Sequence, residues 1–372
     1  MKKVFLPLMA AALLISCNNQ TNEVVPTGDE IMLSSAQKLI TKTPYLNENT
    51  TPGTGTELFA LVPICLSTSD YTSIYKNEIT KDGGDFMNFV DGNATSFCDA
   101  SKTKAPKYYP RGESQDMKLF GLYPVHITAD ADDFWRLTAT GATATITGCE
   151  DVMVAKEVTT SKETAETTPA QTLAFNHMLT QLKVKVAATD ETAVESWEGI
   201  KKLELIAVGS GTEKPKTGIT ATASTGAVAF TGDGEELPFF EWTSVGFTDD
   251  KIVETSNEIA LEGLITDYTK KDDFDDTKTY NAAYIFCQPT TAVKDHATPE
   301  YKIRLTPKYG EPKEVAVDLM DETSTATSEV AFEGETAGHA FTITLIFDVD
   351  EIMAKATVSK WIEGGNTIIE IE

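Results

Sequence analysis

Positive charge is scarce in this sequence. Its 31 lysine and arginine residues stand against 57 aspartate and glutamate residues, which gives a formal net charge of −26 at pH 7. A surface this acidic repels the phosphate backbone of nucleic acids and the anionic headgroups of a membrane. We therefore expect no nucleic-acid partner, and any attachment to a membrane has to run through a covalently bound lipid.

Histidine and cysteine, which often carry catalysis or bind metals, are also few. They form no HExxH, no CxxC and no nucleophile-elbow pattern. His177, in the stretch FNHML, has apolar neighbours, and we interpret it as a histidine at the edge of the core whose ring nitrogens bond the backbone. The sequence thus indicates no catalytic residue, no metal site and no cofactor. The histidines are His126, His177, His296 and His339.

Acidic clusters occur at residues 130–133, 270–276 and 348–351, but none has the spacing and central glycine of an EF-hand calcium loop. We interpret them as solvated loops. Spacing alone leaves open a pair of carboxylates that would hydrolyse glycosides, because such residues meet in space rather than in sequence. A protein that is not an enzyme is the expectation.

The sequence does not decide whether the protein has disulfide bonds. Cys65, Cys98, Cys149 and Cys287 are scattered along the chain, and in an exported protein they can pair in more than one way. Cys65 in LVPICLST and Cys287 in AYIFCQPT lie in apolar, strand-like runs. Buried free thiols are therefore the alternative.

A long apolar run occurs only at the N-terminus, in MKKVFLPLMAAALLIS. Two lysines before a short apolar core are typical of a secretory signal peptide, and this core is shorter than the roughly 20 residues that span a bilayer. Cys17 follows in LLISCNNQ, which resembles the lipobox of bacterial lipoproteins, where signal peptidase II cuts before a cysteine that bears diacylglycerol. We expect residues 1–16 to be a lipoprotein signal peptide, Cys17 to be lipidated, and residues 17–29 to form a linker.

The rest of the chain is rich in short strand patterns. Stretches such as MKLFGLYPVHIT, QLKVKVAA and HAFTITLIFDV contain many β-branched or aromatic residues and often alternate polar with apolar positions. Clusters of Gly, Asp, Thr and Pro separate them, as in TPGTGT and TGDGEELP. This pattern predicts an all-β protein built as antiparallel β-sandwiches. Helices are expected only within residues 69–80 and 191–202.

The length of 372 residues suggests two domains. A weak internal correspondence favours two domains of related build. In each half, an aromatic strand ending at proline precedes an Arg-Leu-Thr strand and an Ala-Phe turn into a long alternating strand. The polar stretch ATDETAVESW lies between the halves, so we predict an N-terminal domain of residues 30–190 and a C-terminal domain of residues 191–372.

Several motifs together resemble the fimbrillin family of Bacteroidales, the subunits of type V pili. The stretches are CEDVMVAK at 149–156, LAFNHMLTQLKVKV at 173–186, and AFTITLIFDV leading to ATVSKWIEGG at 356–365. The positions that match the family pattern are Asp151 to Ala155, then Phe175, His177, Leu179 and Leu182, then Trp361 and Gly364.

The resemblance implies two tandem transthyretin-like sandwiches, exported as a lipoprotein to the outer membrane and the cell surface. There the subunits of this family join into a fimbrium that serves adhesion. A protease removes a strand near the N-terminus, and a strand of a neighbouring subunit fills the groove by forming main-chain hydrogen bonds. The implied partners are other pilin subunits, the outer membrane through the lipid on Cys17, and a glycan or host protein.

The removable strand would be DEIMLSSAQ, residues 29–37, with Ile31 and Leu33 on one face and Met32 on the other. The donor strand would be the stretch NTIIEIE, in which Ile369 and Ile371 alternate with glutamates. The alternative is that both strands complete their own domains.

One departure from the family concerns the cleavage site. The major pilins are cut after an arginine that follows the first strand, whereas this chain has no arginine before Arg111. Lys38 and Lys42 lie in the expected region, so a protease that accepts lysine would cut there. Without that cut the strand would stay, and the subunit would remain at one end of a fibre. The roles of stalk, tip and anchor all stay open.

The alternative function is that of a surface lipoprotein that does not polymerise. Such a protein would bind a glycan or a host ligand through its loops and through exposed aromatic residues. The aromatic residues that we consider for this role are Tyr108, Tyr109 and Trp135.

Overall fold

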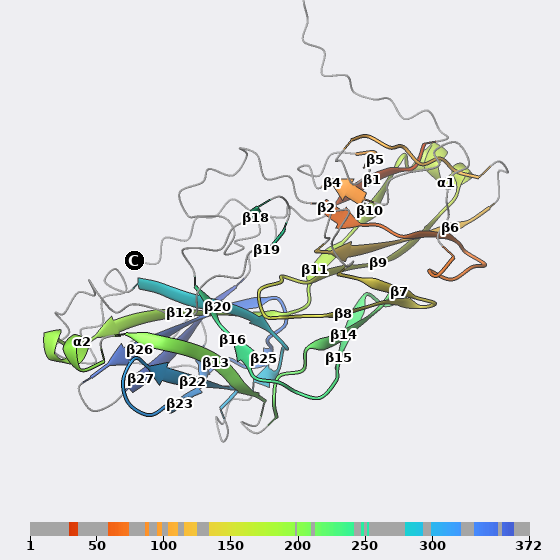
Figure 1. The fold of residues 1–372 in the computed structure, drawn as a ribbon. Coiled ribbons are helices and arrows are strands. Elements are labelled where there is room, and N and C mark those ends of the chain that lie inside the picture. The colour runs from red at the N-terminus through yellow and green to blue at the C-terminus, as the bar shows by residue number, and fades with distance from the viewer. Residues whose placement is uncertain are drawn as a thin grey trace, which may run out of the picture.

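A computed structural model gives the fold of the chain (Figure 1). The prediction of an all-β protein is confirmed, because strands make up most of the described chain. No helix among the described residues is both long and apolar enough to cross a bilayer. The structure describes residues 30–35, 59–73, 86–88, 95–98, 103–110, 115–124, 134–197, 199–209, 213–241, 247–248, 251–252, 280–292, 299–320, 331–348 and 352–360.

The largest sheet of the N-terminal half has the strand order β11-β9-β6-β2-β4-β5, and β3 also pairs with β6. All of these neighbours are antiparallel. Strand β6 and the first three residues of β9 are buried on both faces because each face is covered there by a further layer. The strands are β2 (Phe59–Leu61), β3 (Ile64–Leu66), β4 (Phe86–Asn88), β5 (Phe97–Cys98), β6 (Met117–Tyr123), β9 (Met153–Thr160) and β11 (Phe175–His177).

One of these layers is a pair of parallel strands, β1 (Met32–Ser35) and β10 (Ala170–Leu173). The short helix α1 (Lys162–Thr167) connects β9 to β10. It begins at Ser161, whose side chain accepts a hydrogen bond from the backbone N–H of Thr164. The sequence analysis missed this helix, although the serine cap before it was a usable signal.

The other layer is a sheet in the order β15-β14-β8-β7, which joins the two halves of the chain. In the pairing of β8 with β14, Gly141 lies opposite Thr222. A Cβ atom on Gly141 would stand 1.9 Å from the carbonyl oxygen of Ala221, so only glycine permits this approach. The strands are β7 (Arg136–Thr138), β8 (Gly141–Thr145), β14 (Gly218–Thr222) and β15 (Ala227–Thr231).

Two further sheets pack face to face in the C-terminal half, with strand orders β17-β20-β12-β26-β27-β24 and β16-β13-β22-β23. Strand β12 precedes residue 190 but pairs with β20 and β26, both from beyond it. The boundary at residue 190 stays a prediction. The strands are β12 (Thr180–Ala188), β13 (Ile200–Val208), β16 (Leu237–Pro238), β17 (Phe240–Glu241), β20 (Tyr280–Cys287), β22 (Tyr301–Pro307), β23 (Lys313–Val317), β24 (Leu319–Met320), β26 (His339–Phe347) and β27 (Ile352–Lys360).

The two Arg-Leu-Thr stretches do not occupy equivalent places. Strand β7 pairs with β8 at the end of its sheet, whereas β22 lies between β13 and β23. The two stretches follow the same order of motifs in the sequence, but they occupy different positions in their sheets.

Two small pairs complete the described strands: β18 (Phe247–Thr248) with β19 (Lys251–Ile252), and β21 (Thr291–Ala292) with β25 (Gly334–Glu335).

The helix expected within residues 191–202 is present as α2 (Glu191–Trp197). The indole N–H of Trp197 donates to the carbonyl oxygen of Asp348 at 2.6 Å, which ties the helix to the end of β26. The other helix was expected within residues 69–80. Residues 69–73 form turns and bends instead, and residues 74–80 lie outside the described residues.

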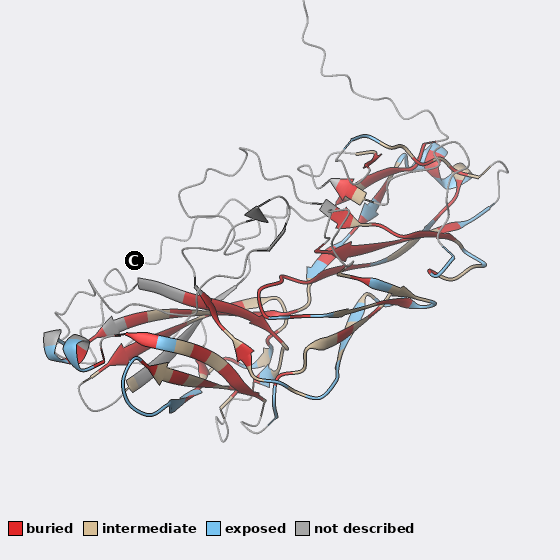
Figure 2. Cartoon of the chain, in the orientation of Figure 1, coloured by how far each residue is buried: buried red, intermediate tan, exposed pale blue. Residues whose placement is uncertain are grey.

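Buried apolar residues form three clusters. Figure 2 colours the buried residues of the strands red. The N-terminal cluster lies between the largest sheet and the β1–β10 pair. It comprises Ile31, Leu33, Ala60, Val62, Ile64, Met87, Phe97, Tyr109, Met117, Leu119, Tyr123, Met153, Ala155, Ala165, Leu173 and Phe175.

The junction cluster draws residues from both halves, so the two halves share one core where they meet. Sheet β15-β14-β8-β7 covers part of it, and β20 and β26 cover another part. It comprises Cys65, Tyr71, Phe120, Leu122, Trp135, Ala142, Ile146, Cys149, Val152, Val154, Leu179, Ile219, Ala221, Ala223, Phe240, Tyr284, Phe286 and Ala340.

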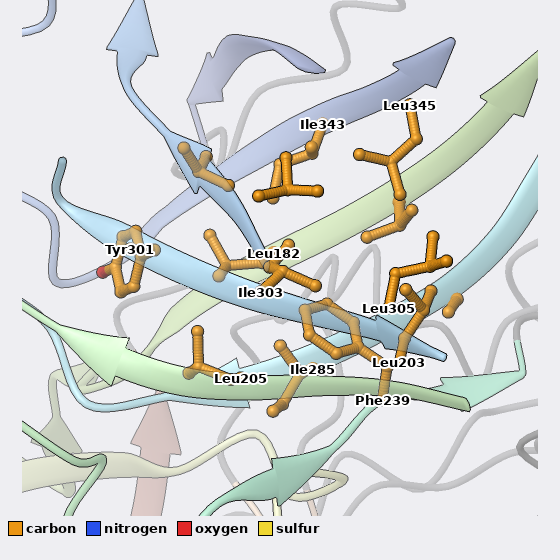
Figure 3. Close-up of a cluster of buried hydrophobic side chains, with 14 of the residues drawn as sticks. Leu182, Leu203, Leu205, Phe239, Ile285, Tyr301, Ile303, Leu305, Ile343 and Leu345 are labelled. Atoms are coloured by element: carbon orange, nitrogen blue, oxygen red, sulfur yellow. The ribbon is translucent and has the colours of Figure 1, made fainter. Parts of the chain in front are cut away.

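The C-terminal cluster fills the sandwich of the two C-terminal sheets (Figure 3). It is centred on Leu182, Leu203, Leu205, Phe239, Ile285, Tyr301, Ile303, Leu305, Ile343 and Leu345.

The question of disulfide bonds has an answer in the structure. Cys65, Cys98, Cys149 and Cys287 are all buried, and none of these four is in a disulfide bond. Burial raises the pKa of the Cys65 and Cys287 thiols, so their charged, reactive forms are disfavoured.

Tyrosine burial predicts a loss of stability at high pH. Burial raises the pKa of Tyr71, Tyr123 and Tyr301 in the folded chain. A raised pKa favours folding fully below the ordinary tyrosine pKa of about 10, and this contribution is lost as the pH rises above it. We expect the free energy of unfolding, measured by urea titration, to fall above about pH 10. The variant Tyr301→Phe should make the free energy of unfolding fall less steeply with pH, by up to about 1.4 kcal/mol per pH unit. An unchanged slope would contradict the raised pKa of Tyr301.

Candidate functional site

Strand β1 is held along both of its edges. On one side it pairs in parallel with β10, where Leu33 lies opposite Gln171. On the other side the backbone N–H of Ile31 donates to the carbonyl oxygen of Lys107 at 2.8 Å, and Leu33 exchanges two backbone hydrogen bonds with Thr95, at 2.9 and 2.7 Å. A segment from the start of the described chain is therefore inserted between two others that follow it much later in the sequence.

Strand β1 and Ile31, the residue before it, bury side chains on both faces. Ile31 and Leu33 are 0% exposed and pack in the N-terminal cluster with residues such as Phe97 and Phe175. Met32 is also buried, and its sulfur lies 3.7 Å from the hydroxyl oxygen of Ser96. Without β1 and the residue before it, the cluster would lose Ile31 and Leu33 and expose the surface that they cover.

Polar contacts fix the two ends of β1. At its start, the carboxylate of Glu30 lies 3.3 Å from the ammonium nitrogen of Lys104 and accepts a hydrogen bond from the hydroxyl of Ser96. Near its end, the hydroxyl oxygens of Ser34 and Thr172 lie 2.9 Å apart. The first contact is largely buried, since Glu30 is 6% exposed, whereas the second is exposed to solvent.

The other predicted residues of the site lie outside the described residues. They are Cys17, Lys38, Lys42, Ile369 and Ile371, together with the motif residues Trp361 and Gly364.

Two of the sequence motifs meet in the structure. Strand β11 pairs with the start of β9, so that His177 lies opposite Met153. The Nδ1 atom of His177 lies 2.9 Å from Oδ1 of Asp151, whose side chain is almost fully buried. His177 does lie at the edge of the core, but the sequence analysis did not identify this carboxylate as a partner of its ring. Burial, and secondarily the charge of Asp151, raise the pKa of Tyr123 nearby.

The aromatic residues considered for ligand binding do not form an exposed surface, and that prediction is wrong. Trp135 is 3% exposed, and its indole N–H donates to the carbonyl oxygen of Pro124 at 3.0 Å. Tyr109 is buried and its hydroxyl lies 3.1 Å from that of Thr160, while Tyr108 is half-buried. Among the described residues, the large apolar side chain that stands exposed is Tyr309. The described part of the chain contains no group of three or more acidic, histidine or cysteine side chains placed to hold a metal ion.

Comparisons with known proteins found likeness in structure alone. No protein-family model and no curated protein matches the chain. A candidate cell adhesion protein of Bacteroides uniformis is 13% identical with a TM-score of 0.47, over 91% of this chain and 100% of that one. A second, of Bacteroides ovatus, is 15% identical with a TM-score of 0.44, over 90% and 97%. A fimbrial protein of Bacteroides vulgatus is 13% identical with a TM-score of 0.40, over 90% and 100%.

Proposed function

We propose that the protein is a structural subunit of a type V cell-surface pilus, as stalk, tip or anchor, and that it serves adhesion. It would be exported as a lipoprotein and assembled by donor-strand exchange. The single observation that carries the proposal is the insertion of β1 between β10 and the segments at Thr95 and Lys107. The motif resemblance described above gives this geometry its functional context.

The departure of β1 would create a binding site for an extended strand. The backbone groups of Thr95, of Lys107 and of β10 that now bond β1 would lose their partners. The N-terminal cluster would lose Ile31 and Leu33 from its interior. Unpaired strand edges beside an apolar groove bind a new strand strongly, because main-chain hydrogen bonds give affinity and buried side chains give register.

The proposed maturation uses residues that the sequence alone supplies. The lipid on Cys17 would deliver the chain to the outer membrane, and cleavage after Lys38 or Lys42 would free β1 from the body of the subunit. Lys38 follows the end of β1 by three residues, since β1 ends at Ser35. The stretch with Ile369 and Ile371 would supply the donor strand to the next subunit.

A direct test follows strand exchange in the purified chain without residues 1–17. Limited trypsin treatment should cut after Lys38 or Lys42 and produce ladders that resist SDS, because exchanged strands are buried as β1 is. The variant in which both lysines are changed to glutamine is the matched control and should stay monomeric. Gel electrophoresis and mass spectrometry of the new N-terminus measure both steps. A subunit that is cut there, loses β1 and stays monomeric would contradict the proposal.

A further inference from the structure

We propose that the groove left by β1 selects its incoming strand by an acidic residue, which Lys104 and Ser96 recognise. The strand that fits would carry this acid immediately before the first of two apolar residues that alternate, in the pattern acid-apolar-x-apolar. This inference rests on the proposed function, since it concerns the same groove after strand release.

The recognition contact is seen with the strand that now occupies the groove. Glu30 directly precedes Ile31, and its carboxylate oxygen Oε1 is shared between the Lys104 ammonium and the Ser96 hydroxyl. Glu30 is 6% exposed, so this carboxylate is largely removed from water. A hydrogen-bonded ion pair at a desolvated position gives more specificity than one at an exposed position.

Both recognising groups belong to the body of the subunit. Ser96 and Lys104 lie beyond the expected cleavage sites in the chain, next to strand β5 and in the segment that pairs with it. They would therefore remain at the end of the groove when β1 leaves. Lys104 is 46% exposed through its side chain, so it can meet an incoming carboxylate from solvent.

The register of the groove fixes where the acid must be. The bridge between Glu30 and Tyr108 and the backbone bond from Ile31 to Lys107 share one register. Leu33 is held by a separate bridge to Thr95. A slip by one residue would turn both apolar side chains out of the N-terminal cluster. The acid that contacts Lys104 therefore occupies the position just before the first buried apolar residue.

The predicted donor stretch of this chain does not carry the pattern. If Ile369 and Ile371 took the places of Ile31 and Leu33, the residue in the place of Glu30 would be Ile368. An apolar side chain there would leave Lys104 and Ser96 without their acid. The occupant that fits best is therefore an extended strand of another subunit that carries this acid, and the tail of a second copy should enter the same groove with lower affinity.

The experiment measures peptide entry into the released groove. A site for a specific protease replaces residues 40–46 in the chain without residues 1–17, and the cut protein is mixed with fluorescent peptides. The peptide DEIMLSSAQ should bind about 10-fold more tightly than its Glu30→Gln form, because a charge-assisted contact is lost. The Asp29→Asn peptide has the same net charge as the Glu30→Gln form and is the matched control. It should bind within about 2-fold of the parent peptide, since the proposed recognition uses the acid at position 30.

Two subunit variants locate the effect. In Lys104→Met, the affinities of the Glu and Gln peptides should differ by no more than about 2-fold. In Ser96→Ala, the difference in affinity should also shrink, but by less. The peptide NTIIEIE should bind more weakly to the unchanged groove than DEIMLSSAQ does. Equal binding of the Glu and Gln peptides, or tight binding of NTIIEIE, would overturn the inference and leave strand exchange standing. A cut protein that admits no peptide at all would overturn strand exchange itself.

Discussion

Replacing Leu33 with alanine should lower the free energy of unfolding by about 3 kcal/mol. Leu33 is fully buried, and its side chain packs in the N-terminal cluster, which includes Phe97 and Phe175. The substitution removes apolar contacts and leaves a cavity in a strand that is fixed on both edges by backbone hydrogen bonds. Denaturant titration of the uncut chain measures the loss.

The neighbouring residue provides the matched control. Ser34 lies on the other face of β1, and its hydroxyl contacts that of Thr172 at an exposed position. Ser34→Ala should change stability by no more than about 0.5 kcal/mol, since exposed contacts contribute little. If Leu33→Ala were as mild as Ser34→Ala, β1 would not be a core strand in solution. The groove would then lack the apolar driving force that strand exchange requires.

The sequence predicted the existence of these elements better than their partners. The alternation in DEIMLSSAQ indicated a strand at residues 29–37, and a strand is present at Met32–Ser35. Its parallel pairing with β10, more than 130 residues later, left no local signal. Which strands become neighbours depends on packing between distant segments, and residue periodicity carries little of that information.

The join between the two halves was missed for the same reason. Strands β8 and β14 lie on opposite sides of the predicted boundary, yet they pair along their whole length. Gly141 is the local requirement for this approach, but a single glycine in a strand has several ordinary explanations. Only the three-dimensional contact with Ala221 shows which one applies.

The misjudged aromatic residues illustrate a different limit. Trp135 was considered as an exposed residue for ligand binding, and it follows the acidic stretch at residues 130–133. In the fold its ring lies in the junction cluster, and Pro124 accepts the indole hydrogen bond. A tryptophan with a backbone acceptor can be buried at little cost, and such an acceptor cannot be found from the sequence.

Replacing His177 with alanine should cost about 2 to 3 kcal/mol of stability, because it would leave the buried carboxylate of Asp151 without the imidazole that hydrogen-bonds to it. The residue Asp151 is 2% exposed, and within the described part of the chain its Oδ2 atom has no hydrogen-bond partner. The pair links β11 to the segment before β9, so its loss loosens the junction of the two motifs. Denaturant titration near neutral pH measures the cost.

A second histidine serves as the control. His339 bonds the carbonyl oxygen of Ala337 at 3.1 Å and is paired with no carboxylate in the contacts described for it, so His339→Ala should cost about 1 kcal/mol. Adding Asp151→Asn to His177→Ala should restore about half of the stability that His177→Ala loses, because an amide is cheaper to bury than an unpaired charge. If instead the double variant were less stable than His177→Ala, the damage would come from lost packing of the imidazole ring. The buried carboxylate would then not be what makes this histidine necessary.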